Sequence, residues 1–180
     1  MTAIAGLVAG RTVHIGGDSA GVSGLSLAVR SDTKVFQRGR YLFGFTTSFR
    51  MGQLIRYSLE APKPAKHDLD AFMATTFVDA LRDCLKKGGW ARKENDREEG
   101  GQFLVGVRGE LYTIHEDYQV AKAADGFAAA GCGSEIALGA LFATAGRGFR
   151  PRQRIKIALA AAERFSAGVR GPFVVRSIER

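Results

Sequence analysis

Short apolar runs separated by Gly-Arg dipeptides open the chain, and residues 12–15 alternate polar with apolar side chains as a half-buried strand does. A glycine-containing dipeptide between two such runs is typical of the tight turn in a β-hairpin. The pattern therefore predicts two hairpins, so that four strands precede the first helix. These strands are residues 2–8, 12–15, 34–36 and 41–45.

Two helical patterns follow these strands. Apolar side chains recur every three or four positions from Met51 to Leu59, and Pro62 and Pro64 end this run because proline cannot continue a helix. A second and longer series follows Asp68, which is a suitable N-cap residue. Its apolar stripe favours a core position for Cys84 over a reactive thiol. The stripe consists of Leu69, Phe72, Met73, Phe77, Ala80, Leu81, Cys84 and Leu85.

The second half of the chain again contains strands followed by helices. Residues 88–101 are polar and bracketed by glycine pairs, which favours either a solvated loop or a contact with a partner subunit. Further strands are predicted at residues 103–107, 110–115, 127–130 and 173–178. Helices are predicted from Ser134 and from Pro151, the latter with an apolar face formed by Ile155, Ala158, Leu159, Ala162 and Phe165.

The order of these elements indicates the fold class. Strands and helices occur in separate runs, which is typical of an α+β fold with helices on the outer faces of antiparallel sheets. Two sheets that each need a covering layer make a four-layer αββα sandwich. A length of 180 residues fits a single domain, residues 1–180.

Composition excludes several classes of protein. Apolar residues make up 46% and charged residues 24% of the chain, which argues against a disordered or fibrous protein. The apolar start lacks a preceding basic segment and is interrupted by Arg11, so neither a signal peptide nor a membrane contact is predicted, and a cytoplasmic location is expected. Cys84 and Cys132 cannot form a disulfide framework, and the histidines lack metal-ligand spacing, so neither a metal nor a cofactor is expected.

Binding of nucleic acid or nucleotide is also not expected. The net charge of +8 favours acidic partners, but no RNA- or DNA-binding motif accompanies it. The turn at residues 131–134 lacks the dinucleotide fingerprint, because Ile136 stands where that fingerprint needs a glycine. No lysine follows as it would in a phosphate-binding P-loop.

Residues 17–21, Gly-Asp-Ser-Ala-Gly, match the G-x-S-x-G pattern of serine hydrolases. That nucleophile elbow requires a helix after the turn, and residues 22–32 have no apolar helical face. A different use of the segment is that Asp18, at the end of a strand, pairs with Lys34, the only lysine in the first 60 residues. A fixed positive charge of this kind lowers the pKa of a neighbouring amine or hydroxyl.

The start of the chain supplies a nucleophile for such a pair. Removal of Met1, expected before a small residue, leaves Thr2 with a free α-amine next to its hydroxyl. The amine can then act as the general base for the hydroxyl, as in covalent acyl transfer by N-terminal threonines. Thr2, Asp18 and Lys34 are therefore candidate catalytic residues.

The chain resembles the proteasome β-subunit family of N-terminal nucleophile hydrolases, and most closely its bacterial HslV-type peptidases. The resemblance covers essentially the whole chain. Its most diagnostic feature is the spacing of Thr2, Asp18 and Lys34. The segments that carry it are Thr2, residues 16–19 (Gly-Gly-Asp-Ser), residues 32–36 (Asp-Thr-Lys-Val-Phe), residues 44–45 (Gly-Phe), residues 54–57 (Leu-Ile-Arg-Tyr) and residues 130–134 (Ala-Gly-Cys-Gly-Ser).

The resemblance implies an αββα sandwich that hydrolyses peptide bonds at a mature N-terminal threonine. Thr2 would be the nucleophile and, through its amine, the base, while Lys34 tunes that amine and Asp18 holds Lys34. The backbone N–H of Thr47 best matches the family's oxyanion donor, which is a glycine N–H. The resemblance further implies a homo-oligomeric ring, a polypeptide substrate and a ring ATPase that unfolds and feeds it.

Three positions depart from the family's pattern. Cys132 replaces a serine, and Ser166 and Val169 replace an aspartate and a serine that support the amine. Glu163, one helical turn from Ser166, is the nearest acid. The sequence therefore leaves two hypotheses: a threonine-type peptidase subunit of a self-compartmentalising ring protease, or a catalytically inactive assembly or binding subunit of the same shape.

Overall fold

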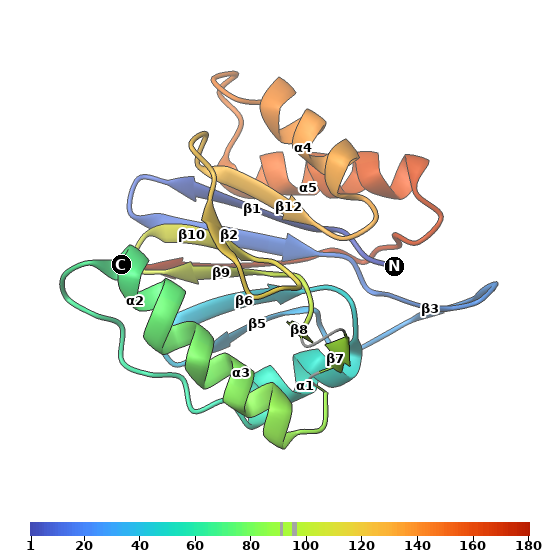
Figure 1. The fold of residues 1–180 in the computed structure, drawn as a ribbon. Coiled ribbons are helices and arrows are strands. Elements are labelled where there is room, and N and C mark those ends of the chain that lie inside the picture. The colour runs from blue at the N-terminus through green and yellow to red at the C-terminus, as the bar shows by residue number, and fades with distance from the viewer. Residues whose placement is uncertain (91, 95–96) are drawn as a thin grey trace.

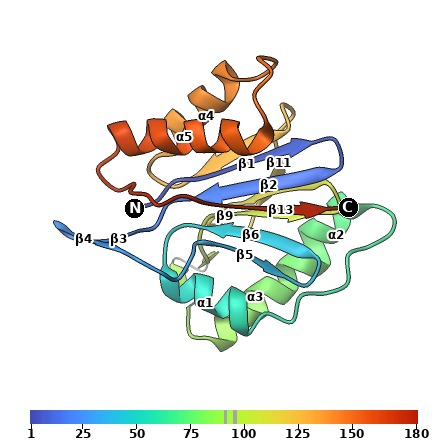
Figure 2. The ribbon, with the colours of Figure 1, turned by 180° about the vertical axis from the view of Figure 1, so that it is seen from behind.

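The computed structural model describes every residue of the chain except 91 and 95–96. Two antiparallel sheets lie face to face, and each outer face is covered by helices (Figures 1 and 2). The order of layers is therefore αββα, as the sequence predicts.

The first sheet contains four strands in the order β12-β1-β2-β13. Strands β1 and β2 form the predicted hairpin, in which Ile4 pairs with Gly17. Strand β12 adds to the other side of β1, where Ile4 pairs with Ala130. The N-terminal end of β1 is thus flanked on both sides by the segments that follow β2 and β12. The bounds are β1 Ile4–Ala9, β2 Thr12–Gly17, β12 Phe127–Ala130 and β13 Val174–Glu179.

The second sheet contains five strands in the order β11-β10-β9-β6-β5. Both predicted hairpins are present, one formed by β5 and β6 and the other by β9 and β10. Strands β6 and β9 pair in the middle, with Phe45 opposite Phe103. The bounds are β5 Val35–Arg38, β6 Tyr41–Phe45, β9 Phe103–Val107, β10 Glu110–Ile114 and β11 Val120–Lys122.

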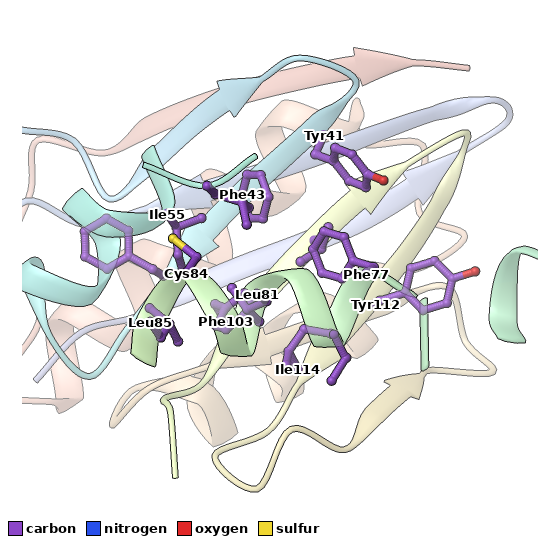
Figure 3. Close-up of a cluster of buried hydrophobic side chains, with 14 of the residues drawn as sticks. Tyr41, Phe43, Ile55, Phe77, Leu81, Cys84, Leu85, Phe103, Tyr112 and Ile114 are labelled. Carbon is purple, nitrogen blue, oxygen red and sulfur yellow. The ribbon is translucent and has the colours of Figure 1, made fainter. Parts of the chain in front are cut away.

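Helices α4 (Ser134–Ala143) and α5 (Pro151–Phe165) pack on the first sheet. Helix α1 (Phe49–Tyr57) and the long helical segment from Leu69 to Lys87 pack on the second. Figure 3 shows aromatic side chains of β6 and the helical segment packed together, including Phe43 and Phe77. Cys84 lies in this core, as its place in the apolar stripe predicts.

The long helical segment departs from the regular α-helix that the apolar stripe predicts. It consists of α2 (Leu69–Phe72), the π-helical turn η1 (Met73–Phe77) and α3 (Val78–Lys87). Phe72 and Phe77 are five positions apart, and the wider π-helical turn keeps both directed toward the core cluster.

Two short hairpins were not predicted. Strands β3 (Ala20–Ser23) and β4 (Ser26–Val29) project from the body, so six strands rather than four precede α1 (Figure 1). All side chains of β4 are exposed and only Ala20 of β3 is buried, so the apolar pattern of a buried strand is absent. Within the predicted loop of residues 88–101, β7 (Arg92–Glu94) pairs with β8 (Arg97–Glu99).

One prediction about the last helix is wrong at a single position. The side chains of Ile155, Ala158, Leu159 and Ala162 are fully buried under α5, whereas 75% of the Phe165 side chain is exposed. Phe165 is the final residue of the helix and lies beyond the edge of the sheet-facing stripe. In the described part of the chain, no helix is long and apolar enough to cross a membrane.

Candidate active site

Thr2 lies in the wall of a cavity beside the start of β1. It directly precedes β1, and only 5% of its surface is exposed. The cavity has a volume of about 370 Å³. Its walls come from the β3–β4 hairpin and from the segment between β6 and α1, and they include Thr2, Arg30, Lys34, Phe45, Thr47 and Phe49.

Asp18 and Lys34 form a buried ion pair behind Thr2. The Lys34 ammonium lies 2.8 Å from Asp18 Oδ1, and their side chains are 1% and 0% exposed. Burial lowers the pKa of Lys34, while the Asp18 carboxylate acts in the opposite direction and favours the charged ammonium. Lys34 therefore brings a buried positive charge to the cavity wall.

The strand register explains why Asp18 lies beside Thr2. Because Ile4 pairs with Gly17, the residue after β2 lies opposite the residue before β1. Asp18 Oδ1 accepts a hydrogen bond from the Ala3 backbone N–H at 3.0 Å. Asp18 Oδ2 accepts two more, from Ala20 N–H at 2.9 Å and Arg170 N–H at 3.3 Å. These three backbone donors hold the carboxylate in place independently of its ion pair with Lys34.

The same register on the other side of β1 brings Cys132 to Thr2. Thr2 N–H donates to Cys132 Sγ at 3.2 Å, and the Cys132 thiol lies 3.4 Å from the Thr2 carbonyl oxygen. The Gly133 N–H also donates to the Thr2 carbonyl, at 3.2 Å. The turn that opens α4 therefore holds the backbone of Thr2 from two sides.

Ser166 completes this contact chain at the end of α5. Its hydroxyl lies 3.5 Å from Cys132 Sγ. Val169 is fully buried among the apolar side chains under α5. It therefore provides no polar group in place of the serine of the family's pattern. Glu163 accepts a hydrogen bond from the Gly171 N–H at 2.8 Å, and so it supports the loop whose Arg170 N–H binds Asp18.

Thr47 lines the cavity within the segment between β6 and α1. Its φ of 61° is in the left-handed region, which a β-branched residue rarely adopts. Among the hydrogen bonds found in the described part of the chain, none uses the Thr47 backbone N–H. Strain of this kind is retained where surrounding contacts enforce it, and here Gln102 N–H donates to Thr47 Oγ1 at 3.2 Å.

The structure thus brings together all six residues singled out from the sequence, namely Thr2, Asp18, Lys34, Thr47, Cys132 and Ser166. The serine elbow is absent, because β2 leads into β3 rather than into a helix. Gln102 and Arg30 were missed. Arg30 forms a bidentate ion pair with Asp32 and lies 3.8 Å from the centre of the Phe49 ring. No motif or spacing in the sequence distinguishes either residue.

A steric prediction follows from Gly131, whose φ is +93°. A Cβ added there would lie 2.3 Å from the Thr2 carbonyl oxygen. Gly126 also has a positive φ, but an added Cβ meets nothing within 4 Å. Gly126→Ala is expected to cost only the left-handed conformation, about 1–2 kcal/mol. Gly131→Ala should cost about 1–3 kcal/mol more because of the clash. Urea denaturation of both variants measures the difference, and equal losses would contradict the close approach.

Comparison with protein-family models gives no match, and comparison with curated proteins gives none either. Solved structures match over nearly the whole chain. BPH of Thiobacillus denitrificans in complex with epoxomicin gives a TM-score of 0.82 at 17% identity, covering 99% of this chain and 98% of that one. Another structure of BPH gives 0.82 at 18% identity over the same shares. Eukaryotic HslV from Trypanosoma brucei gives 0.74 at 22% identity, covering 99% of this chain and 100% of that one.

The chain has the N-terminal nucleophile hydrolase fold. This agreement confirms the predicted α+β, αββα architecture and, at the level of the fold, the resemblance to HslV-type relatives of the proteasome β-subunits. In this N-terminal nucleophile hydrolase fold, the start of the chain lies at the cavity, next to the segments that follow β2, β6 and β12.

Proposed function

We propose that this protein is a threonine-type peptidase whose nucleophile is Thr2 after removal of Met1. The observation that carries the proposal is the position of Thr2 at a cavity whose wall includes Lys34, which forms a buried ion pair with Asp18. A fully buried, hydrogen-bonded ion pair is costly to maintain, and a fixed charge beside a nucleophile is one use for it. Met1 is 57% exposed and lines the cavity, so its removal would also widen the site.

In the proposed reaction, the Thr2 hydroxyl attacks the carbonyl carbon of a peptide bond, and its proton passes to the Thr2 α-amine. The charged Lys34 lowers the pKa of that amine, so that a fraction is neutral and able to accept the proton at neutral pH. The amine then returns the proton to the leaving amine of the substrate. Water hydrolyses the resulting ester and regenerates Thr2.

The remaining site residues support these steps. The Thr47 backbone N–H is the proposed donor to the oxyanion of the tetrahedral intermediate, because it lies in the cavity wall without another partner among the described residues. Cys132 contacts the Thr2 nitrogen and Ser166 contacts Cys132, so both are proposed to orient the amine. No cofactor takes part in this scheme.

The similarity of the fold to BPH and HslV, rather than a contact within the chain, supports the proposed assembly. A homo-oligomeric ring that encloses the cavities would restrict the protein to unfolded polypeptide substrates. An ATPase ring that delivers such substrates is the matching partner, and the expected location is the cytoplasm. BPH of Thiobacillus denitrificans, which has a similar structure, has been solved in complex with epoxomicin, and HslV from Trypanosoma brucei also has a similar structure.

The intact mass of the purified protein tests this proposal, before and after incubation with a peptide epoxyketone. The expected result is a mass that lacks Met1 and increases by one inhibitor molecule. A protein that retains Met1 and forms no adduct would instead be the inactive assembly or binding subunit. In that outcome the Asp18–Lys34 pair would serve the fold alone.

A further inference from the structure

Gln102 contacts both loops that the proposed reaction uses. It is half-buried and directly precedes β9, where the register places it opposite Thr46. Its backbone carbonyl accepts hydrogen bonds from the Thr46 N–H at 3.1 Å and from the Thr46 hydroxyl at 2.8 Å. Its own N–H donates to Thr47 Oγ1. The backbone of Gln102 therefore holds the segment that carries the proposed oxyanion donor.

The side chain of Gln102 reaches the other loop. Its Oε1 accepts a hydrogen bond from the Gly131 N–H at 3.2 Å. Gly131 begins the turn in which the next two residues, Cys132 and Gly133, contact the backbone of Thr2. One residue thus connects the Thr47 segment with the turn that orients the Thr2 nitrogen.

We propose that Gln102 is a positioning residue, whose side-chain oxygen sets the distance between the Thr2 amine and the Thr47 N–H. This inference rests on the proposed function. In that reaction the amine and the N–H act on the same tetrahedral centre, one on the attacking hydroxyl and one on the oxyanion. A displacement of about 1 Å between such groups can lower a rate by as much as a hundredfold.

The backbone and the side chain of Gln102 make different contacts, so their roles can be tested separately. Its backbone contacts to Thr46 and Thr47 survive any side-chain substitution that leaves the strand intact. The side chain alone carries the bond to Gly131, and Gln102 does not line the cavity that would hold the substrate. A side-chain variant should therefore affect the chemical step and leave substrate binding nearly unchanged.

The experiment measures inactivation by a peptide epoxyketone, read as the mass adduct, for the full chain and three variants. Gln102→Leu removes the acceptor at similar size, and Gln102→Glu keeps an acceptor oxygen. Gln119→Leu is the matched control, because Gln119 is exposed and lines the same surface depression as Gln102. The maximal inactivation rate and the half-saturating inhibitor concentration are determined separately. Both are calculated from the fraction of each protein that can form the adduct.

Gln102→Leu is expected to lower the maximal rate about tenfold, with the half-saturating concentration changed by less than about twofold. Gln102→Glu should restore most of the rate, and Gln119→Leu should match the wild type. A Gln102→Leu protein that reacts at the wild-type rate would overturn the positioning role alone. Failure of Gln102→Glu to restore the rate would likewise reduce Gln102 to a structural role. A wild type that forms no adduct would refute the peptidase itself, and this inference with it.

Discussion

Thr2→Ala is expected to abolish peptide cleavage and adduct formation while leaving the fold intact. The variant removes the attacking oxygen, and loss of a covalent nucleophile lowers the rate by at least about a thousandfold. Among the hydrogen bonds of the described residues, the Thr2 hydroxyl takes part only in the one that it donates to the Met1 carbonyl oxygen, so its removal deprives no other buried group of a hydrogen-bond partner. Hydrolysis of a fluorogenic peptide series and the intact-mass assay measure the effect.

Two controls separate chemistry from folding in this comparison. Thr2→Ser keeps a hydroxyl beside the amine and is expected to retain measurable activity and a single adduct. Thr113→Ala makes the same change as Thr2→Ala at a half-buried position on strand β10, away from the cavity, and should leave the cleavage rate unchanged. Cleavage by Thr2→Ala at the rate of Thr113→Ala would rule out Thr2 as the nucleophile.

The sequence predicts the site best where neighbouring strands carry it. Thr2 precedes and Asp18 follows the hairpin formed by β1 and β2, so the lengths of these strands bring the two residues together. The apolar pattern of the sequence indicates those lengths. Lys34 is identified because it is the one lysine close enough in the chain. Thr2 and Asp18 thus needed only local pairing to be placed, whereas Lys34 precedes β5 of the second sheet and reaches Asp18, which follows β2 of the first sheet, across the interface between the two sheets.

Gln102 could not be found in this way, because its role depends on contacts between distant segments. It meets Thr46 through the pairing of β6 with β9, and it meets Gly131 through the approach of the two sheets. A glutamine before a strand carries no pattern of its own. The β3–β4 hairpin was missed for a different reason: β4 is exposed throughout and β3 is buried only at Ala20, so burial imposes no alternation on their side chains.

Lys34→Met is expected to abolish cleavage and also to destabilise the fold. It leaves the Asp18 carboxylate buried without its counter-charge, and breaking a buried ion pair costs about 3–5 kcal/mol. The lower end of this range is expected, because three backbone N–H groups still donate to the carboxylate. Urea denaturation gives the stability, and peptide hydrolysis is measured below the midpoint of unfolding.

The pH dependence of stability provides a second signature of Lys34. Burial lowers the pKa of Lys34 below its ordinary value of 10.5, so in alkaline solution the unfolded chain binds more protons at this residue than the folded chain does. This group therefore makes the wild type more stable as the pH rises from the folded pKa toward 10.5. Lys34→Met lacks the group, and its unfolding free energy should not show that rise.

Lys122→Met is the matched control for both effects. Lys122 also binds an aspartate, Asp70 at 3.0 Å, but their side chains are 41% and 63% exposed. Solvent and salt screen such a pair, so its loss is expected to cost less than about 1 kcal/mol and to leave the cleavage rate unchanged. If folded Lys34→Met cleaved peptides as fast as Lys122→Met, the buried charge would have no part in activating Thr2. The Asp18–Lys34 pair would then only join the start of β1 to the second sheet.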